Sequence, residues 1–256
     1  MNESLLQAVT ELARIMGNNA MRYYRSAIDV ETKLDGSPVT IADKSSERLA
    51  REWIAKTFPR DAIIGEEFGV LNESAERKWI IDPIDGTKAF VRGVPFWGSL
   101  VAVADGESVL AGAVSFPATG EILSAAVGEG AWCNEQRCKV SDCATVDKAT
   151  VLTTDATFRG YPREREGWDA LANKALVSRT WGDCYGYLLV ATGRAEVMVD
   201  AIVNAWDVAA IMPAITEAGG VFTDWSENVT AFGRNAIATN ANIADEARQI
   251  LNGSAR

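Results

Sequence analysis

Apolar residues recur at helical spacing in two stretches near the start of the chain. The first stretch predicts a helix over residues 3–25, whose apolar face consists of Leu5, Leu6, Val9, Leu12 and Met16. The second predicts a helix over residues 41–58, which ends before Pro59 because proline cannot continue a helix. A polar turn around Asp35, Gly36 and Pro38 separates them. We therefore expect two helices joined by a turn.

Short apolar runs interrupted by glycine, proline and Asp-Gly turns follow these helices. Residues 62–69 and 79–82 predict two strands that end on acidic residues. Residues 99–105, 108–116 and 121–134 predict three antiparallel strands. This half of the chain is therefore predicted to be α+β.

The second half alternates strand and helix signals. After a strand over residues 149–154 and a loop or helix around 168–175, residues 179–200 predict a helix that Gly193 stops, followed by a strand. Residues 205–220 predict one helix, and residues 220–225 a closing strand. A mixed layered architecture follows. We treat residues 1–256 as one unit; a division into 1–140 and 141–256 stays open, because no change in composition marks it.

Length and composition indicate a globular protein. Of the 256 residues, 48% are hydrophobic, which is enough to bury a sizeable core. The N-terminal segment is acidic and amphipathic, so it lacks the basic start and apolar centre of a signal peptide. The longest apolar runs are too short to cross a bilayer. We expect a cytoplasmic protein with no membrane partner.

The charge balance excludes one class of partner. The chain has 25 Lys and Arg residues against 35 Asp and Glu residues, a formal net charge of -10. Such a surface repels nucleic acid phosphates, and no basic run offsets it. We expect no nucleic acid polymer as a partner.

The absence of histidine narrows the chemistry further. It excludes Ser-His-Asp and Cys-His catalysis as well as histidine-bound metals. The cysteines lack the spacing of a zinc knuckle or redox pair and are expected to be structural thiols: Cys133, Cys138, Cys143 and Cys184. Any reaction must use carboxylates, hydroxyls, lysines or a hard metal ion.

Acidic residues follow several apolar segments. Glu66 and Glu67 end one predicted strand, Asp82 and Asp85 another, and Asp207 lies in the first turn of a predicted helix. Each set also has an explanation that needs no metal. Glu66 and Glu67 could be a solvated pair, Asp82 and Asp85 a turn with an Asx cap, and Asp207 an acid that stabilises a helix N-terminus. Carboxylates that converge would repel one another unless cations lie between them. The set therefore predicts a site for a hard ion, above all Mg²⁺.

Three motifs carry a family resemblance. "GEE" at 65–67, "WIIDPIDGTKAF" at 79–90 and "WDVAAIMPAITEAGG" at 206–220 resemble the three signature motifs of the inositol monophosphatase family, in the family's order. The resemblance implies a Mg²⁺-dependent, lithium-sensitive phosphomonoesterase with an α-β-α-β-α sugar-phosphatase-like fold. It also implies a homodimer that acts on a small phosphate ester.

The resemblance assigns roles residue by residue. It implies two or three Mg²⁺ ions held by Glu66, Asp82, the Ile84 carbonyl, Asp85 and Asp207. Asp85, Gly86 and Thr87 would lie against the substrate, with the phosphate at Gly86 and Thr87. Thr87 and Asp43, together with Glu66, would orient and deprotonate the attacking water. Physically this is metal-assisted in-line phosphoryl transfer.

The region after these motifs resembles the histidinol-phosphate phosphatase branch of the family. The resemblance rests on Lys88, on "VRGVPFWGSLVAV" at 91–103, and on Asp183 and Asp200. Histidinol is cationic, so Asp183 and Asp200 would give charge-assisted hydrogen bonds to it; Asp183 could equally be a helix N-cap. We expect hydrolysis of L-histidinol phosphate. The alternatives are an inositol-1-phosphate phosphatase, a 3'(2'),5'-bisphosphate nucleotidase and a non-catalytic metal- or ligand-binding protein.

Overall fold

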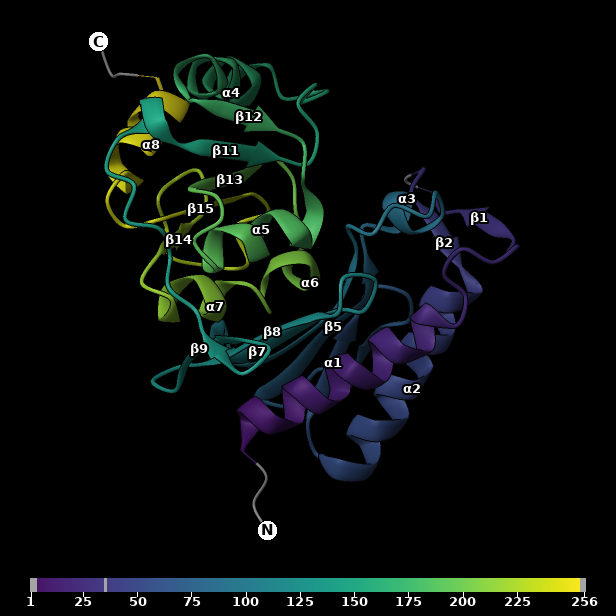
Figure 1. Cartoon of the computed structure of the whole chain (residues 1–256). Helices are drawn as coiled ribbons and strands as arrows, with labels where there is room; N and C mark the ends of the chain where they lie inside the picture. The colour runs from purple at the N-terminus through teal and green to yellow at the C-terminus, as the bar shows by residue number, and fades with distance from the viewer. Residues whose placement is uncertain (1–3, 35, 254–256) are drawn as a thin grey trace.

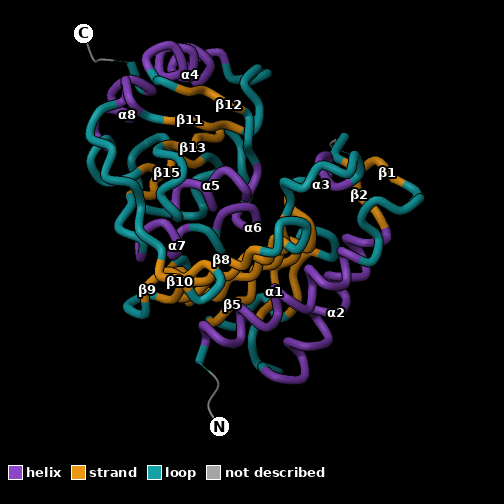
Figure 2. Tube along the Cα trace, in the orientation of Figure 1, coloured by secondary structure: helices purple, strands orange, loops and turns teal. Residues whose placement is uncertain are grey.

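Two β-sheets lie between three layers of helices in the computed structural model, which describes residues 4–34 and 36–253 (Figure 1). From one side to the other the layers are a helix pair, an eight-stranded sheet, central helices, a five-stranded sheet and outer helices. Figure 2 shows the strands of these two sheets as separate blocks with the central helices between them. The predicted α-β-α-β-α fold with mixed sheets is confirmed.

The larger sheet has the strand order β10-β9-β8-β7-β6-β5-β3-β4. Its neighbours are antiparallel except for the parallel pair β3 and β5. The strands are β3 (Ala62–Gly65), β4 (Gly69–Leu71), β5 (Arg77–Asp85), β6 (Gly98–Asp105), β7 (Ser108–Phe116), β8 (Glu121–Ala126), β9 (Gly130–Cys133) and β10 (Gln136–Arg137).

The smaller sheet has the order β12-β11-β13-β15-β14. The first three strands run parallel, and β15 is antiparallel to both of its neighbours. The strands are β11 (Thr150–Thr153), β12 (Val177–Arg179), β13 (Val197–Asp200), β14 (Val221–Thr223) and β15 (Ala236–Thr239). A short hairpin, β1 (Val30–Thr32) and β2 (Pro38–Thr40), stands apart from both sheets.

The helices form the remaining layers. The first pair is α1 (Leu5–Met21) and α2 (Ile41–Thr57), the central helices are α5 (Asp183–Ala191), α6 (Ala205–Val208) and α7 (Met212–Glu217), and the outer helices are α4 (Pro162–Lys174) and α8 (Ala244–Leu251). The remaining helical elements of the described residues are two single turns: α3 (Thr87–Phe90) and the 3₁₀ turn Val146–Lys148. No helix among the described residues is long and apolar enough to span a membrane.

Successive residues of a strand point to opposite faces of its sheet, so neighbouring apolar residues pack in different cores. Ile81 faces α1 and α2, whereas its neighbour Ile80 faces the core around the central helices. Likewise Leu152 joins the central core, and Val151 packs on the other face of its sheet with α4 and α8. Both sheets are therefore buried on two faces, which explains why their strands read as continuous apolar runs.

Several predicted elements were wrong in extent. Residues 205–220 form two short helices instead of one, because Pro213 has no N–H to donate to Ala209 and interrupts the helical ladder. Residues 121–134 form the hairpin β8–β9 instead of one strand, with Gly128 in the turn at a φ of 81°. The first helix ends at Met21 instead of residue 25, and its predicted start at Glu3, like Asp35 of the predicted turn, lies outside the described residues.

Other elements were predicted only in part or not at all. The segment around 168–175, which was predicted as a loop or a helix, is the end of α4, while β15 and α8 had no sequence-based prediction. β15 lies between β13 and β14, so the predicted closing strand β14 is an edge strand. The central core contains residues from both halves of the chain. Whether residues 1–140 and 141–256 act as separate units stays a prediction.

Candidate active site

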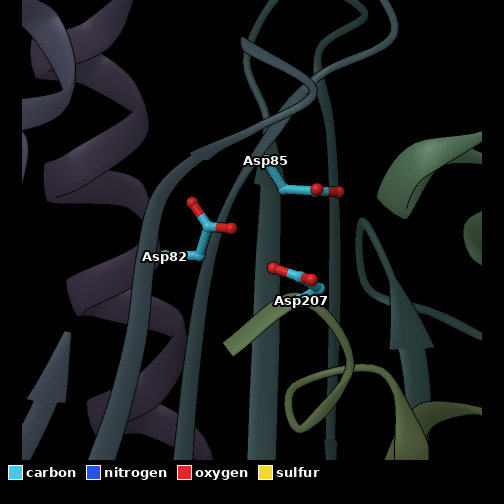
Figure 3. A group of neighbouring side chains, drawn as sticks. All are labelled: Asp82, Asp85 and Asp207. Atoms are coloured by element: carbon cyan, nitrogen blue, oxygen red, sulfur yellow. The ribbon is translucent and has the colours of Figure 1, made fainter. Parts of the chain in front are cut away.

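Three aspartates converge between the large sheet and the central helices. Asp82 and Asp85 come from β5 and Asp207 from α6, and one carboxylate oxygen of each lies within 4.8 Å of the others. Figure 3 shows the three side chains next to one another, Asp82 and Asp85 on one side and Asp207 at the start of α6. The structure therefore brings together three of the predicted metal ligands.

An irregularity in β5 makes this possible. Residues three apart on a regular strand point to opposite faces, but the pairing of β5 with β6 shifts register between Asp82 and Asp85. The strand thus runs on to Asp85 instead of ending at residue 82 as predicted, and Pro83 lies within the bulge. The Ile84 N–H donates to Oδ1 of Asp82 at 3.0 Å, and the Ser99 hydroxyl donates to the Pro83 carbonyl at 2.6 Å. These bonds fix the bulge.

Asp207 also has a structural role. It is the third residue of α6, and its Oδ2 accepts a hydrogen bond from the Asn204 N–H at 2.7 Å in a capping box. The helix N-terminal reading of this residue and its place in the acidic cluster therefore coexist.

The cluster is electrostatically strained. Burial, then Glu66 and the other two aspartates, raise the pKa of Asp82 well above its ordinary value. Burial, then Asp183 and Asp207, do the same to the pKa of Asp85. Burial raises the pKa of Asp207 to about 7. Clustered oxygen ligands whose ionised forms repel one another fit a hard divalent cation such as Mg²⁺.

Glu66 lies beside the three aspartates but forms an ion pair of its own. Lys33 Nζ lies 2.7 Å from Oε1 of Glu66 and 2.6 Å from Oε1 of Glu67. Burial raises the pKa of Glu67 to about 7. Lys33 was missed by the sequence analysis, because nothing in a polar turn shows that one lysine will bridge two distant acids.

Thr87 and Asp43 meet at the start of α3. The Thr87 hydroxyl donates to the Ile84 carbonyl at 2.9 Å and lies 3.5 Å from Oδ1 of Asp43. The other oxygen of Asp43 accepts from the Thr40 N–H at 2.8 Å and from its hydroxyl at 2.6 Å. Burial raises the pKa of Asp43 to about 6. The predicted pair is therefore adjacent, and Thr40 is a partner that the sequence analysis missed.

Gly86 is required where it stands. Its φ is 84°, and a Cβ there would lie 2.8 Å from the Phe96 carbonyl and 3.3 Å from Oδ2 of Asp183. Glycine lets the chain turn from the bulge into α3 while the Asp183 carboxylate approaches it closely.

A cavity of about 270 Å³ opens beside the aspartates. Its wall contains five acidic residues together with basic and aromatic side chains: Asp85, Asp155, Asp183, Asp200 and Asp207, then Lys88, Arg159, Phe158, Tyr161 and Tyr187. All the predicted substrate-side acids thus face one cavity. Arg159 and the aromatic residues were not predicted as site residues: Phe158, Arg159 and Tyr161 lie in a loop, and Tyr187 lies within α5.

Asp183 occupies an unusual backbone position on the cavity wall. Its φ is 49°, and its N–H donates to the Thr154 hydroxyl at 2.8 Å. The next N–H, that of Cys184, donates to Oδ2 of Asp85. The N-cap of α5 is Gly182 and has no side-chain cap, so the alternative reading of Asp183 as the N-cap was wrong. Burial raises the pKa of Asp183 to about 6, and Lys88 opposes the rise.

Asp200 is held from both sides. Its Oδ1 accepts from the Thr154 N–H at 3.1 Å and its Oδ2 from the Tyr187 hydroxyl at 2.9 Å. Burial raises its pKa to about 7. Thr154 therefore links Asp183 to Asp200, a connection that the sequence gave no means to predict.

Comparisons with known proteins agree on one family. The model of the inositol monophosphatase family matches residues 1–253. The histidinol-phosphatase of Chlorobaculum parvum is 40% identical over 93% of this chain and 96% of its own length. That of Mycobacterium tuberculosis is 35% identical over 97% and 95%. The solved structure of the Thermotoga maritima IMPase superimposes with a TM-score of 0.86 at 32% identity, over 95% of this chain and 94% of that one.

Proposed function

The chain belongs to the inositol monophosphatase family of metal-dependent phosphatases, and we propose that it hydrolyses L-histidinol phosphate to L-histidinol and phosphate. The two relatives compared above are named for this activity and are similar to this chain over nearly its whole length. The substrate proposed here is a small phosphate ester that enters the cavity beside the aspartates.

The Asp183 carboxylate is the observation that carries the choice of substrate. It lines the cavity, and no residue in the described part of the chain donates a hydrogen bond to its oxygens. With a pKa of about 6 it is mostly ionised at neutral pH. A half-buried anion without a donor favours a cationic ligand. Histidinol supplies an ammonium and an imidazole, whereas inositol offers only hydroxyls.

Each group of the site then has a task. Asp82, Asp85 and Asp207, joined by Glu66 and the Ile84 carbonyl, would hold two or three Mg²⁺ ions. Bound Mg²⁺ supplies positive charge for the phosphate and the leaving oxygen and makes water easier to deprotonate. The Thr87 hydroxyl would orient the attacking water, accept a proton from it and pass its own hydroxyl proton to Asp43. The raised pKa of Asp43, about 6, suits this carboxylate to accept a proton.

A second candidate substrate class has its own support. Lys88 and Arg159 line the same cavity, and two cations would suit a substrate with a second phosphate, such as fructose 1,6-bisphosphate or adenosine 3',5'-bisphosphate. Lys88 also faces Asp183, however, and lowers its pKa. Part of the positive charge is thereby already balanced within the protein, which leaves less of it for a second phosphate.

Phosphate release from a substrate panel tests the proposal. The purified protein is assayed with Mg²⁺, and again with EDTA, on histidinol phosphate, inositol 1-phosphate and the two bisphosphates. We expect kcat/KM for histidinol phosphate to exceed the others by at least about tenfold, since charged hydrogen-bond partners discriminate strongly. Asp183→Asn should remove most of that preference. A bisphosphate or inositol 1-phosphate as best substrate would refute the choice, and no Mg²⁺-dependent turnover would refute the activity itself.

A further inference from the structure

A buried carboxylate that the proposed chemistry does not use lies behind the turn that holds Glu66. Glu47, in the second turn of α2, has no exposed surface. Arg51, one helical turn further on, pairs with its Oε1 at 2.8 Å. A fully buried acid persists only when its oxygens are satisfied, so its partners indicate what it is for.

Those partners are the backbone of the Glu66–Glu67 turn. The Glu67 N–H donates to Oε2 of Glu47 at 2.7 Å, and the Phe68 N–H donates to Oε1 at 3.1 Å. Arg51 extends the same arrangement, since its Nη2 donates to the Gly69 carbonyl. One carboxylate and its arginine therefore bind the turn from β3 to β4 along its length.

Gly65 is fitted to this contact. A Cβ at Gly65 would lie 2.1 Å from Oε1 of Glu47 and 2.8 Å from Nη2 of Arg51. Both side chains would have to shift to make room for a Cβ, so a glycine before Glu66 lets the carboxylate reach the backbone. The glycine of the "GEE" motif thus has a packing reason, which concerns Glu47 and not the metal.

The result is that the backbone of Glu66 is fixed on both sides. Its own N–H donates to the Ile81 carbonyl of β5 at 3.3 Å, and the following N–H is held by Glu47. The Glu66 side chain, a predicted metal ligand, therefore extends from a backbone that hydrogen bonds hold on two sides.

We infer that Glu47 is a positioning residue, which sets the place of Glu66 in the metal site through two backbone hydrogen bonds and touches neither metal nor substrate. The inference rests on the proposed function in so far as Glu66 is a metal ligand. Groups that orient metal ligands commonly change metal affinity about 10–100-fold when they are replaced.

Glu217 offers a matched control. Its carboxylate also accepts two backbone hydrogen bonds, from Gly128 and Gly130, each at 2.9 Å. It anchors the β8–β9 turn against α7 and has no contact with the acidic cluster. Replacing either glutamate with glutamine puts an amide in place of one acceptor oxygen. Only the Glu47 change should reach the metal site.

Mn²⁺ binding, followed by the electron paramagnetic resonance signal of free Mn²⁺ without substrate, tests the inference independently of turnover. We expect Glu47→Gln to weaken Mn²⁺ binding by about tenfold or more, and Glu217→Gln to leave it within about twofold of wild type. Thermal unfolding in EDTA accompanies each measurement. Unchanged Mn²⁺ affinity in folded Glu47→Gln protein, or an equal loss in Glu217→Gln, would overturn the inference.

Arg51→Gln covers the case in which Glu47→Gln does not fold. This variant removes the ion pair that orients the Glu47 carboxylate, so both backbone hydrogen bonds should weaken without being abolished, and we expect a smaller loss of Mn²⁺ affinity, about three- to tenfold. An affinity equal to wild type would count against the inference. Wild-type protein that binds Mn²⁺ but releases no phosphate from the substrate panel would refute the proposed function and leave the inference standing.

Discussion

Replacing Asp207 with asparagine is expected to stabilise the metal-free protein while removing its activity. The charge of Asp207 raises the pKa of both Asp82 and Asp85, so this residue repels two neighbours at once. An asparagine keeps an oxygen that can accept the hydrogen bond from the Asn204 N–H, which the aspartate accepts at 2.7 Å. The change therefore removes repulsion without removing the helix cap.

The size of this stabilisation follows from the distances between the carboxylate oxygens. The ligand oxygens lie within 4.8 Å of one another, and two unit charges at that distance repel by about 3 kcal/mol at an effective dielectric constant of 20. Partial protonation and solvent reduce this value, since Asp207 has a pKa of about 7. We expect a gain of about 1–3 kcal/mol in the free energy of unfolding at pH 8 without metal, or about 2–4 °C per kcal/mol.

The pH dependence of stability tests independently whether Asp207→Asn raises the free energy of unfolding. The pKa of Asp207 rises from 3.8 to about 7 on folding, so the folded protein binds this proton more tightly than the unfolded chain. The associated stability is fully present below about pH 4 and is lost as pH rises through about 7. In EDTA the wild-type protein should therefore lose stability over this range, and the variant should lose less. The difference in stability between the two proteins should therefore shrink as pH falls from 8 toward 5.

Differential scanning calorimetry in EDTA and in Mg²⁺, from pH 5 to pH 8, measures both effects. Mg²⁺ should reverse the order, because only the wild-type protein gains binding free energy. Asp224→Asn is the matched control, since Asp224 is a buried aspartate that accepts two hydrogen bonds from Asn228 outside the cluster, at 2.8 and 2.9 Å. It should lose stability whether or not Mg²⁺ is present. An Asp207→Asn protein no more stable than wild type at pH 8 in EDTA would refute the reasoning.

Three further changes test other parts of the site. Lys33→Met should tighten Mg²⁺ binding severalfold in calorimetric titration, because Lys33 no longer competes for Glu66; weaker binding would contradict this. Thr87→Val should lower kcat about 10²–10⁴-fold with little change in Mg²⁺ affinity, and the hydroxyl of Thr87→Ser should restore much of the loss. Gly112→Ala should cost about 1–3 kcal/mol in urea unfolding, since its Cβ would lie 2.3 Å from the Ala210 carbonyl.

The sequence predicted the elements with strong periodicity and the acids that follow them. The helix over residues 41–58 and the strands over 99–105 and 108–116 agree with α2, β6 and β7 within a residue or two. Asp82, Asp85 and Asp207 do converge, as their common place after apolar segments indicated. The local sequence pattern is enough to predict a helix or strand that buries a whole face. It is also enough to predict a site when acidic residues recur at the ends of several such elements.

What the sequence could not predict depends on contacts between distant segments. The bulge that turns Asp82 and Asp85 to one side is defined by pairing with β6, and the bridge from Lys33 to Glu66 joins a hairpin to a strand end. The split of residues 205–220 was visible in Pro213, but the apolar pattern of the segment outweighed it. The bulge and the lysine bridge are properties of tertiary pairing, which a single sequence does not encode locally, whereas the split is a local effect of Pro213.

The site exists only where the two halves of the chain meet, and the packing there leaves little freedom. Asp82 and Asp85 come from the large sheet, whereas Asp183 and Asp207 come from central helices that follow in the second half. Glycines allow the close approach: a Cβ at Gly112 would meet the Ala210 carbonyl, and one at Gly86 would press on Asp183. Because backbone contacts set these distances, the spacing of the carboxylates is fixed by the fold before any ion binds. The repulsion within the cluster is thus stored in a rigid frame, which is why removing one charge should stabilise the protein and adding a cation should do the same.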